Sequence, residues 1–162
     1  VSISYGIMSS MNIRFATAND KTQVLALMDE LGEEINRTRG YSPHNTEASK
    51  VGGKMFNEVV SRKDTMIFVA EDEGKLIGLM TFYLLPNLRH GFYGGHVEDI
   101  VVSKSYRRKG VGTQLFDAVK NYCKEHNISV IKLDTGLDLT DAHTFYEKLG
   151  GTFTEKMFRF DL

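Results

Sequence analysis

The sequence predicts an α/β (α+β) fold with a mixed, mostly antiparallel central sheet and helices on both of its faces. Apolar residues recur at helical spacing in several segments, and short β-rich runs lie between these segments. Two neighbouring runs are separated by an acidic, glycine-containing turn, which is typical of a hairpin. Strand–helix–strand units follow the hairpin, and such units place helices on both sides of a partly parallel sheet.

One strand and two helices precede the hairpin. Asn12–Ala16 is predicted as a short strand, and Asn19 or Asp20 can cap the helix that follows it. That helix is indicated by apolar residues at helical spacing, namely Val24, Leu27, Met28, Leu31 and Ile35. After a loop over Gly40–His44, a second helix is predicted from about residue 46 to residue 61 by Val51, Met55, Phe56 and Val59.

The hairpin and the later elements are predicted from apolar runs and the residues that end them. Met66–Ala70 and Leu76–Leu85 are the hairpin strands, and Pro86 and Asn87 are expected to end the second one. The later elements are a strand over Phe92–Val102, a helix over about Gly110–His126, a strand over Val130–Leu133, a helix over about Leu139–Leu149 and a final strand over Thr152–Phe160.

Length, composition and charge limit the classes of protein to consider. The 162 residues suit one domain, expected over residues 11–162, with residues 1–10 as a leader or frayed extension. A hydrophobic content of 41% and a charged content of 25% are ordinary for a globular protein. The formal net charge of −1 gives no overall attraction to nucleic acid or anionic lipid, so a polyanion must be bound locally.

Cysteine and histidine usage argues against disulfides and metal centres. Cys123 is the only cysteine, which excludes an intrachain disulfide and fits a reducing cytoplasm. Its apolar helical surroundings predict a buried small hydrophobe and not a nucleophile. None of the five histidines forms a recognisable metal motif, and we expect no metal. No apolar run approaches the length of a membrane span, and no signal peptide is visible, so no membrane partner is expected.

The segment VEDIVVSKSYRRKGVGTQLF, from Val97 to Phe116, predicts an anion site between a strand and a helix. Unpaired N–H groups and the positive end of the helix dipole meet at such a point, and Gly110 and Gly112 permit close backbone approach. The alternative is a tight turn with a solvated basic face. Neither familiar nucleotide-loop spacing is present, so a nicotinamide dinucleotide or ATP is not the expected guest.

Two motifs in this order resemble the GNAT superfamily of acetyl-CoA-dependent N-acetyltransferases. The first is Arg-x-x-Gly-x-Gly, supplied by Arg107, Gly110 and Gly112. The second is DAHTFYEKLGG, Asp141–Gly151, which resembles a family helix that carries Ala, then Phe-Tyr-Glu-Lys, and ends at Gly. The resemblance covers essentially Asn12–Leu162 and implies the GNAT fold and acetyl-CoA as the acetyl-donor cosubstrate.

The resemblance also implies which residues bind acetyl-CoA. The backbone of Ile100, Val101 and Val102 would bond the pantetheine arm, and Tyr146 would lie close to the thioester sulfur. The pyrophosphate would be cradled by Arg107, Arg108, Lys109, Gly110, Val111, Gly112 and Thr113. Leu139 occupies a position where the family commonly has Asn, so one side-chain contact to the cofactor is expected to be missing or replaced by Asp141 or His143.

Acyl transfer to an amine needs a base, an oxyanion stabiliser and, ideally, a proton donor for the leaving thiolate. We expect Glu98 to serve as the base, directly or through a water, and Tyr146 as the proton donor. Strand alternation predicts that Glu98 and Asp99 point to opposite faces. For Asp99, contact with the acceptor and a structural pairing or capping role both stay open.

The acceptor is expected to be the primary amine of a small molecule. The stretch GHVEDIVV, Gly95–Val102, most resembles glucosamine 6-phosphate N-acetyltransferases. Arg89, His90 and Tyr93 are candidate acceptor contacts, although Tyr93 can equally pack in the core. Arg37 and Arg39 are a second possible source of positive charge.

Other functions stay as alternatives to this expectation. A protein or peptide lysine or N-terminal acceptor remains an alternative, as does a non-catalytic acetyl-CoA-binding regulator. A nucleic-acid-binding module is disfavoured by the net charge, in spite of the basic cluster Lys104–Lys109. A homodimer is possible, because dimers are common among similar proteins.

Overall fold

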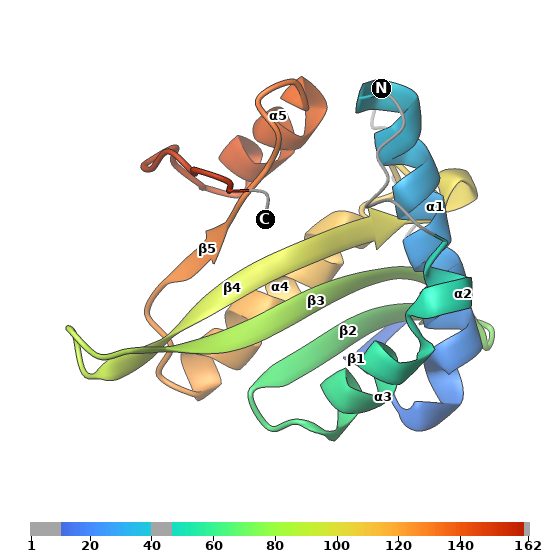
Figure 1. Ribbon diagram of the computed structural model, residues 1–162, viewed down its shortest axis with the longest axis horizontal. Coiled ribbons are helices and arrows are strands. Elements are labelled where there is room, and N and C mark those ends of the chain that lie inside the picture. Colours follow the sequence, from blue (N-terminus) through green and yellow to red (C-terminus); the bar gives the residue numbers. More distant parts are fainter. Residues whose placement is uncertain (1–10, 40–46, 161–162) are drawn as a thin grey trace, which may run out of the picture.

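Five strands form one sheet in the order β1-β2-β3-β4-β5 in the computed structural model, which describes residues 11–39 and 47–160 (Figure 1). Their bounds are Asn12–Phe15, Thr65–Asp72, Lys75–Asn87, Phe92–Val102 and Ile131–Leu133. Strands β1 to β4 pair antiparallel, and only β4 and β5 pair parallel. The predicted mixed, mostly antiparallel sheet is therefore confirmed. The predicted leader and the loop over Gly40–His44 lie outside the described residues.

Helices cover both faces of the sheet, as predicted. The five α-helices are α1 (Lys21–Arg39), α2 (Ala48–Val51), α3 (Gly53–Ser61), α4 (Val111–Glu125) and α5 (Thr140–Lys148). Helices α1 and α3 contact β2 and β3 on one side, whereas α4 crosses the other side (Figure 1). Helix α5 follows β5 and lies beside the start of α4.

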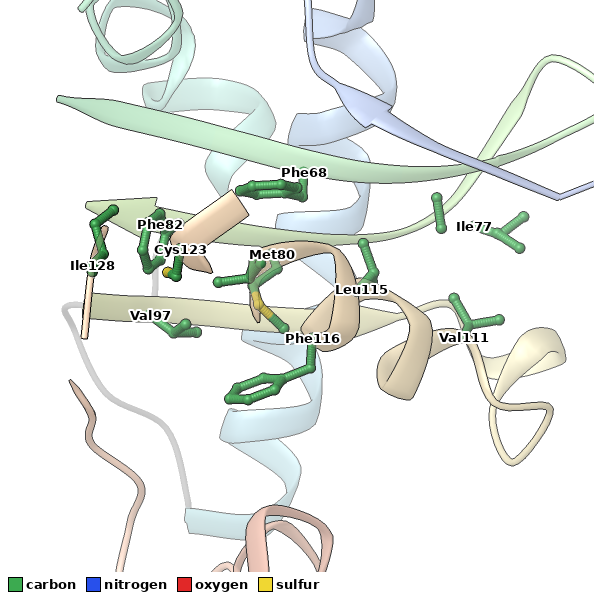
Figure 2. Packing of buried hydrophobic residues seen from close by; sticks show 12 residues of the cluster. Phe68, Ile77, Met80, Phe82, Val97, Val111, Leu115, Phe116, Cys123 and Ile128 are labelled. Atoms are coloured by element: carbon green, nitrogen blue, oxygen red, sulfur yellow. The ribbon is translucent and has the colours of Figure 1, made fainter. Parts of the chain in front are cut away.

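Each face of the sheet has its own apolar cluster. On the α4 side, Phe82, Leu115 and Val119 are completely buried (Figure 2). Cys123 belongs to this cluster, and burial raises the pKa of its thiol to about 11. The thiol is therefore protonated at neutral pH, which agrees with the predicted role as a small buried hydrophobe.

The second predicted helix is divided in two at Gly52. An added Cβ at Gly52 would lie 2.8 Å from the carbonyl oxygen of Ala48 and 2.9 Å from Cδ2 of Leu25. Close packing against α1 thus explains the glycine at this junction. The apolar spacing did not reveal the break, because it continues in phase from α2 into α3.

Two strand predictions need correction. Strand β3 does not stop at Pro86, which pairs with Tyr93 of β4. The pairing between β2 and β3 ends at Tyr83, so Pro86 lies in a part of β3 that β2 does not reach. A proline, which has no backbone N–H to donate, therefore costs no hydrogen bond to β2. The predicted strand over Thr152–Phe160 is wrong, because this segment pairs with no described strand. Strand β5 is only three residues long and offers too short a template.

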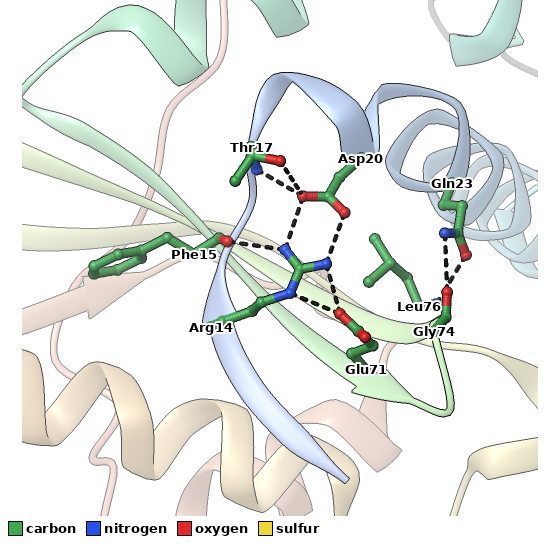
Figure 3. Close-up of polar contacts among 8 residues, drawn as sticks. All are labelled: Arg14, Phe15, Thr17, Asp20, Gln23, Glu71, Gly74 and Leu76. Atoms are coloured by element: carbon green, nitrogen blue, oxygen red, sulfur yellow. Dashed lines mark hydrogen bonds and ion pairs between the residues drawn. The ribbon is translucent and has the colours of Figure 1, made fainter.

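A partly buried ion-pair cluster joins β1, β2 and the turn before α1 (Figure 3). The guanidinium of Arg14 donates to both carboxylate oxygens of Asp20, each at 2.8 Å, and its Nε donates to Glu71 at 2.7 Å. Asp20 also accepts from the backbone N–H and the hydroxyl of Thr17. The predicted cap needs correction: α1 begins at Lys21, directly after Asp20, but the N-cap residue of the short helical turn that leads into it is Thr17, and Asp20 is the N3 residue of that capping box.

Candidate active site

The loop between β4 and α4 presents a row of main-chain N–H groups. Arg108 and Gly110 both have left-handed backbone conformations, with φ of 62° and 82°, and Gly110 caps α4. Within the described residues, none of the N–H groups from Arg108 to Thr113 donates a hydrogen bond. Alternating right- and left-handed residues at a helix start form a concave anion site. The loop therefore has N–H groups that an anion could accept, and the pyrophosphate cradle stays a prediction.

The basic side chains of this loop already have partners. Arg107 Nε donates to the carbonyl oxygen of Val102 at 3.0 Å, and its Nη1 lies 3.4 Å from Glu34 of α1. Exposed Arg108 pairs with Asp141 at 3.2 Å, and the Lys109 ammonium lies over the ring of Tyr106. The N–H groups, and not these cations, are therefore the groups that are free to receive an anion.

Helix α1 also holds the start of the loop. Glu30 accepts from the Ser103 hydroxyl at 3.1 Å and from the N–H of Lys104 at 3.4 Å. Glu34, one helical turn later, lies between Arg37 and Arg107, and these contacts hold the pKa of its carboxyl below the ordinary range. Two carboxylates of α1 thus fix the loop to the opposite layer of the fold.

Helix α5 brings Tyr146 to the start of α4. A Cβ added to Gly112 would lie 3.3 Å from the ring of Phe145, so a side chain here would press on α5. The Tyr146 ring contacts Phe116 and Phe145 at centroid distances of 6.4 and 5.3 Å. Burial, and next the charge of Asp99, raises the pKa of Tyr146 to about 12. Its hydroxyl stays protonated at neutral pH.

A β-bulge in β4 places Glu98 and Asp99 opposite the single residue Thr81. Met80 pairs with Ile100 and Phe82 pairs with Val97, so β4 carries one extra residue between these pairs. Val97 and Ile100, three positions apart, both contact the α4-side cluster. The alternation that predicted opposite faces for the two acids is therefore interrupted here.

Asp99 is anchored, whereas Glu98 reaches solvent. The backbone N–H of Asp99 donates to the Thr81 hydroxyl at 2.9 Å, and that hydroxyl donates to the Asp99 carboxylate at 3.1 Å. Burial raises the pKa of Asp99, and the charge of Glu98 adds to the increase. The Glu98 side chain is 57% exposed. Of the two roles left open for Asp99, the pairing role is present, with a hydroxyl in place of an Arg.

Strand β5 separates from β4 at the bulge. The two strands pair only over Gly95, His96 and Val97, and β5 then turns away toward α5 (Figure 1). From Glu98 to Val102, the β4 edge that faces away from β3 has no described strand partner. The backbone of Ile100–Val102 can therefore pair with an extended, amide-containing ligand.

Several residues at this opening were not singled out as site residues. His96 Nε2 lies 3.2 Å from Glu98 and 3.9 Å from Asp134, which follows β5. Burial, and then the charges of Asp99 and Glu98, raises the pKa of Tyr83. Only strand register brings Tyr83, His96 and Asp134 to the acids, and register is not visible in the sequence.

The candidate acceptor contacts at the start of β4 lie far from Glu98. Arg89 and His90 contact each other in the β3–β4 turn. Tyr93, which is 55% exposed, lines a pocket with Arg62, Lys63, Asp64 and Leu84. Residues 93 and 98 are about 17 Å apart along an extended strand. The structure does not bring these side chains together with the acids.

The start of α5 shows how the expected substitutes for Leu139 are placed. Leu139 is the N-cap residue, Asp141 pairs with Arg108, and His143 Nε2 lies 2.8 Å from the carbonyl oxygen of Gly136.

Within residues 11–39 and 47–160, no three His, Cys, Asp or Glu side chains are grouped to hold a metal. No helix in this part of the chain is long and apolar enough to cross a membrane.

Known proteins share this architecture. A model of the acetyltransferase (GNAT) family matches residues 28–151. An N-alpha-acetyltransferase of Sulfurisphaera tokodaii is 32% identical over 59% of this chain and 61% of its own length, so the chain spans less than two thirds of that relative. A glucosamine 6-phosphate N-acetyltransferase of Trypanosoma brucei brucei is 29% identical over 74% of this chain and 83% of its own length.

A solved structure supports the same fold. The crystal structure of a transcriptional regulator from Bacillus halodurans C-125 superposes with a TM-score of 0.79 at 24% identity, over 94% of this chain and 99% of that one. At this identity the likeness concerns the fold alone. The family model, in contrast, spans the loop, the bulge and Tyr146 together, and the chain belongs to the acetyltransferase (GNAT) family.

Proposed function

We propose that the protein is an acetyl-CoA-dependent N-acetyltransferase that acts on the primary amine of a small molecule. One observation carries this proposal: the open β4 edge over Glu98–Val102 leads directly into the row of unbonded N–H groups at Arg108–Thr113. An extended amide chain that ends in a diphosphate matches the edge and the row in that order. Acetyl-CoA has these two parts, an amide-containing pantetheine arm and a diphosphate, in this order.

The residues at the β4 opening suit direct transfer of the acetyl group. A neutral amine attacks the thioester carbonyl, the new C–N bond forms, and the C–S bond breaks to release CoA thiolate. The amine proton passes to Glu98, directly or through a water, and the Tyr146 hydroxyl hydrogen-bonds the leaving sulfur. Direct attack by the amine needs no covalent enzyme intermediate, and the thiol of Cys123 on α4 is buried in the core.

The acceptor assignment has support from the sequence around the bulge. The relative that is named for glucosamine 6-phosphate aligns over 83% of its length, whereas two relatives that are named N-alpha-acetyltransferases align over 61% and 75% of theirs. A small amine is therefore the favoured acceptor, and a protein N-terminus is the competing one. The single buried cysteine is consistent with the cytoplasmic setting that we also propose.

The test is CoA release from acetyl-CoA against glucosamine 6-phosphate, spermidine, an aminoglycoside, an amino acid and an N-terminal peptide. We expect one small amine to be acetylated, and Glu98→Gln to lower kcat by about 10²-fold. A reaction with the peptide alone would contradict the small-molecule assignment. Failure of acetyl-CoA both to react and to raise the melting temperature would contradict the function itself.

We expect Glu34→Gln to tighten CoA binding by up to about fivefold. The substitution removes a negative charge 3.4 Å from Arg107, beside the N–H row that receives the diphosphate, and partly exposed pairs of this kind are worth up to about 1 kcal/mol. The dissociation constant of CoA, measured by calorimetry, checks the effect. Glu33→Gln is the control, because it removes an exposed charge from the same helix. Equal affinities would show that Glu34 does not oppose the ligand.

A further inference from the structure

We infer that His96 is a positioning residue for acetyl transfer, and that it holds the Glu98 carboxylate at the point where β4 and β5 separate. The inference rests on the proposed function. His96 acts beside the proposed base Glu98, and its ring contacts the Glu98 carboxylate and not the reacting atoms. The supporting observations are the register of His96, its contacts and the exposure of its partner.

Strand register places His96 at the junction of three strands. It pairs across the sheet with Tyr83 of β3 on one side and with Lys132 of β5 on the other. The next pair, Val97 with Leu133, is the last before β5 leaves β4. His96 is thus held in the paired part of the sheet, whereas Glu98 lies just beyond it, at the opening.

The imidazole is the only described partner of the proposed base. His96 Nε2 lies 3.2 Å from Oε2 of Glu98, which is an ion pair when the imidazole is protonated, and no other ion pair or side-chain hydrogen bond of Glu98 occurs within residues 11–39 and 47–160. The His96 side chain is 20% exposed and the Glu98 side chain 57% exposed. A glutamate loses much rotamer freedom when it is fixed, and this contact supplies the constraint before the substrate arrives.

Asp134 approaches the same nitrogen from the other strand. Its Oδ2 lies 3.9 Å from His96 Nε2, beyond hydrogen-bond distance but within reach of an ion pair when the ring is protonated. The imidazole therefore lies between two carboxylates on opposite sides of the opening. Lys132 pairs with His96 across the two strands, but its ammonium forms an ion pair with Glu155 at 2.8 Å. Lys132 therefore does not compete with His96 for Glu98.

A positioning role makes a prediction that a purely structural role does not. If His96 acts only through Glu98, its removal matters only while Glu98 is present. Losses from the two substitutions are then strongly non-additive, whereas independent contributions add. If His96 serves only to join β4 and β5, its loss lowers stability and affects kcat equally in both backgrounds.

The experiment compares His96→Leu and His96→Gln in the wild-type and Glu98→Gln backgrounds, with the best amine of the panel. We expect His96→Leu to lower kcat about 10-fold at unchanged KM for acetyl-CoA, because misplacement of a base costs rate and not donor binding. His96→Gln retains an N–H donor and should stay within about threefold of the wild type. In the Glu98→Gln background, His96→Leu should change kcat less than about twofold.

Glu98→Asp keeps the test decisive if His96→Leu does not fold. It shortens the exposed side chain and withdraws the carboxylate from an intact His96, so kcat should again fall about 10-fold. Glu125→Gln, which removes an exposed carboxylate at the end of α4, is the control. Additive losses, or an unchanged kcat in His96→Leu, would overturn the inference while the proposed function stands. A wild-type protein that releases no CoA with any amine would overturn both.

Discussion

We expect Tyr146→Phe to lower kcat by roughly 10²-fold and to leave CoA binding unchanged. Burial raises the pKa of the hydroxyl to about 12, so it is protonated throughout the range in which an amine is a nucleophile. A thiol has a pKa near ~8.5. We therefore expect the hydroxyl to stabilise the departing thiolate as a hydrogen-bond donor without transferring its proton completely. The phenyl ring keeps the contacts to Phe116 and Phe145.

Tyr122→Phe is the matched control for this substitution. Tyr122 also has a hydroxyl whose pKa is raised by burial, but it stacks on His126 at the far end of α4. Steady-state rates and the CoA dissociation constant should be measured for both variants. A loss of less than about threefold in Tyr146→Phe, or an equal loss in Tyr122→Phe, would contradict the assigned role.

Local signals in the sequence were sufficient to predict the glycine-containing start of α4. Gly110 is needed for a left-handed cap, and Gly112 for the close approach of Phe145, and both requirements act within a few residues or on an adjacent helix. The mixed sheet could also be predicted, because its strands carry alternating or continuous apolar runs. Features of this kind depend on residue type and spacing, which the sequence displays directly.

The arrangement around Glu98 depends on register and could not be predicted. One extra residue in β4 places Asp99 on Thr81 and interrupts the alternation of faces. The contact between His96 and Glu98 likewise depends on where β5 leaves β4. The segment Thr152–Phe160 has the composition of a strand, but strand formation requires a partner edge, and composition alone carries no information about that edge.

The largest stability effect is expected for Arg14→Met. The substitution leaves the carboxylate of Asp20, which is 6% exposed, without its cation, and Glu71 loses the same partner. Removing the partner of a buried acceptor costs about 1–3 kcal/mol in the free energy of unfolding, because the Asp20 carboxylate then keeps only its contacts with Thr17. Urea unfolding at pH 7 measures the loss. Arg62→Met is the control, since its pair with Asp64 is exposed; an equal effect of the two substitutions would contradict the argument.

The same cluster predicts an acid-sensitive stability. Arg14, then the Thr17 contacts, hold the pKa of Asp20 well below its ordinary value, so the unfolded chain takes up this proton before the folded one does. The contribution of Asp20 is complete above its unfolded value of about 4 and is lost as pH falls toward the lower folded value. Asp20→Asn should therefore be less stable than the wild type at pH 7, with the difference shrinking at pH 3. A stability difference between the two proteins that does not change with pH would contradict this prediction. It would mean that the pKa of Asp20 is the same in the folded and the unfolded chain.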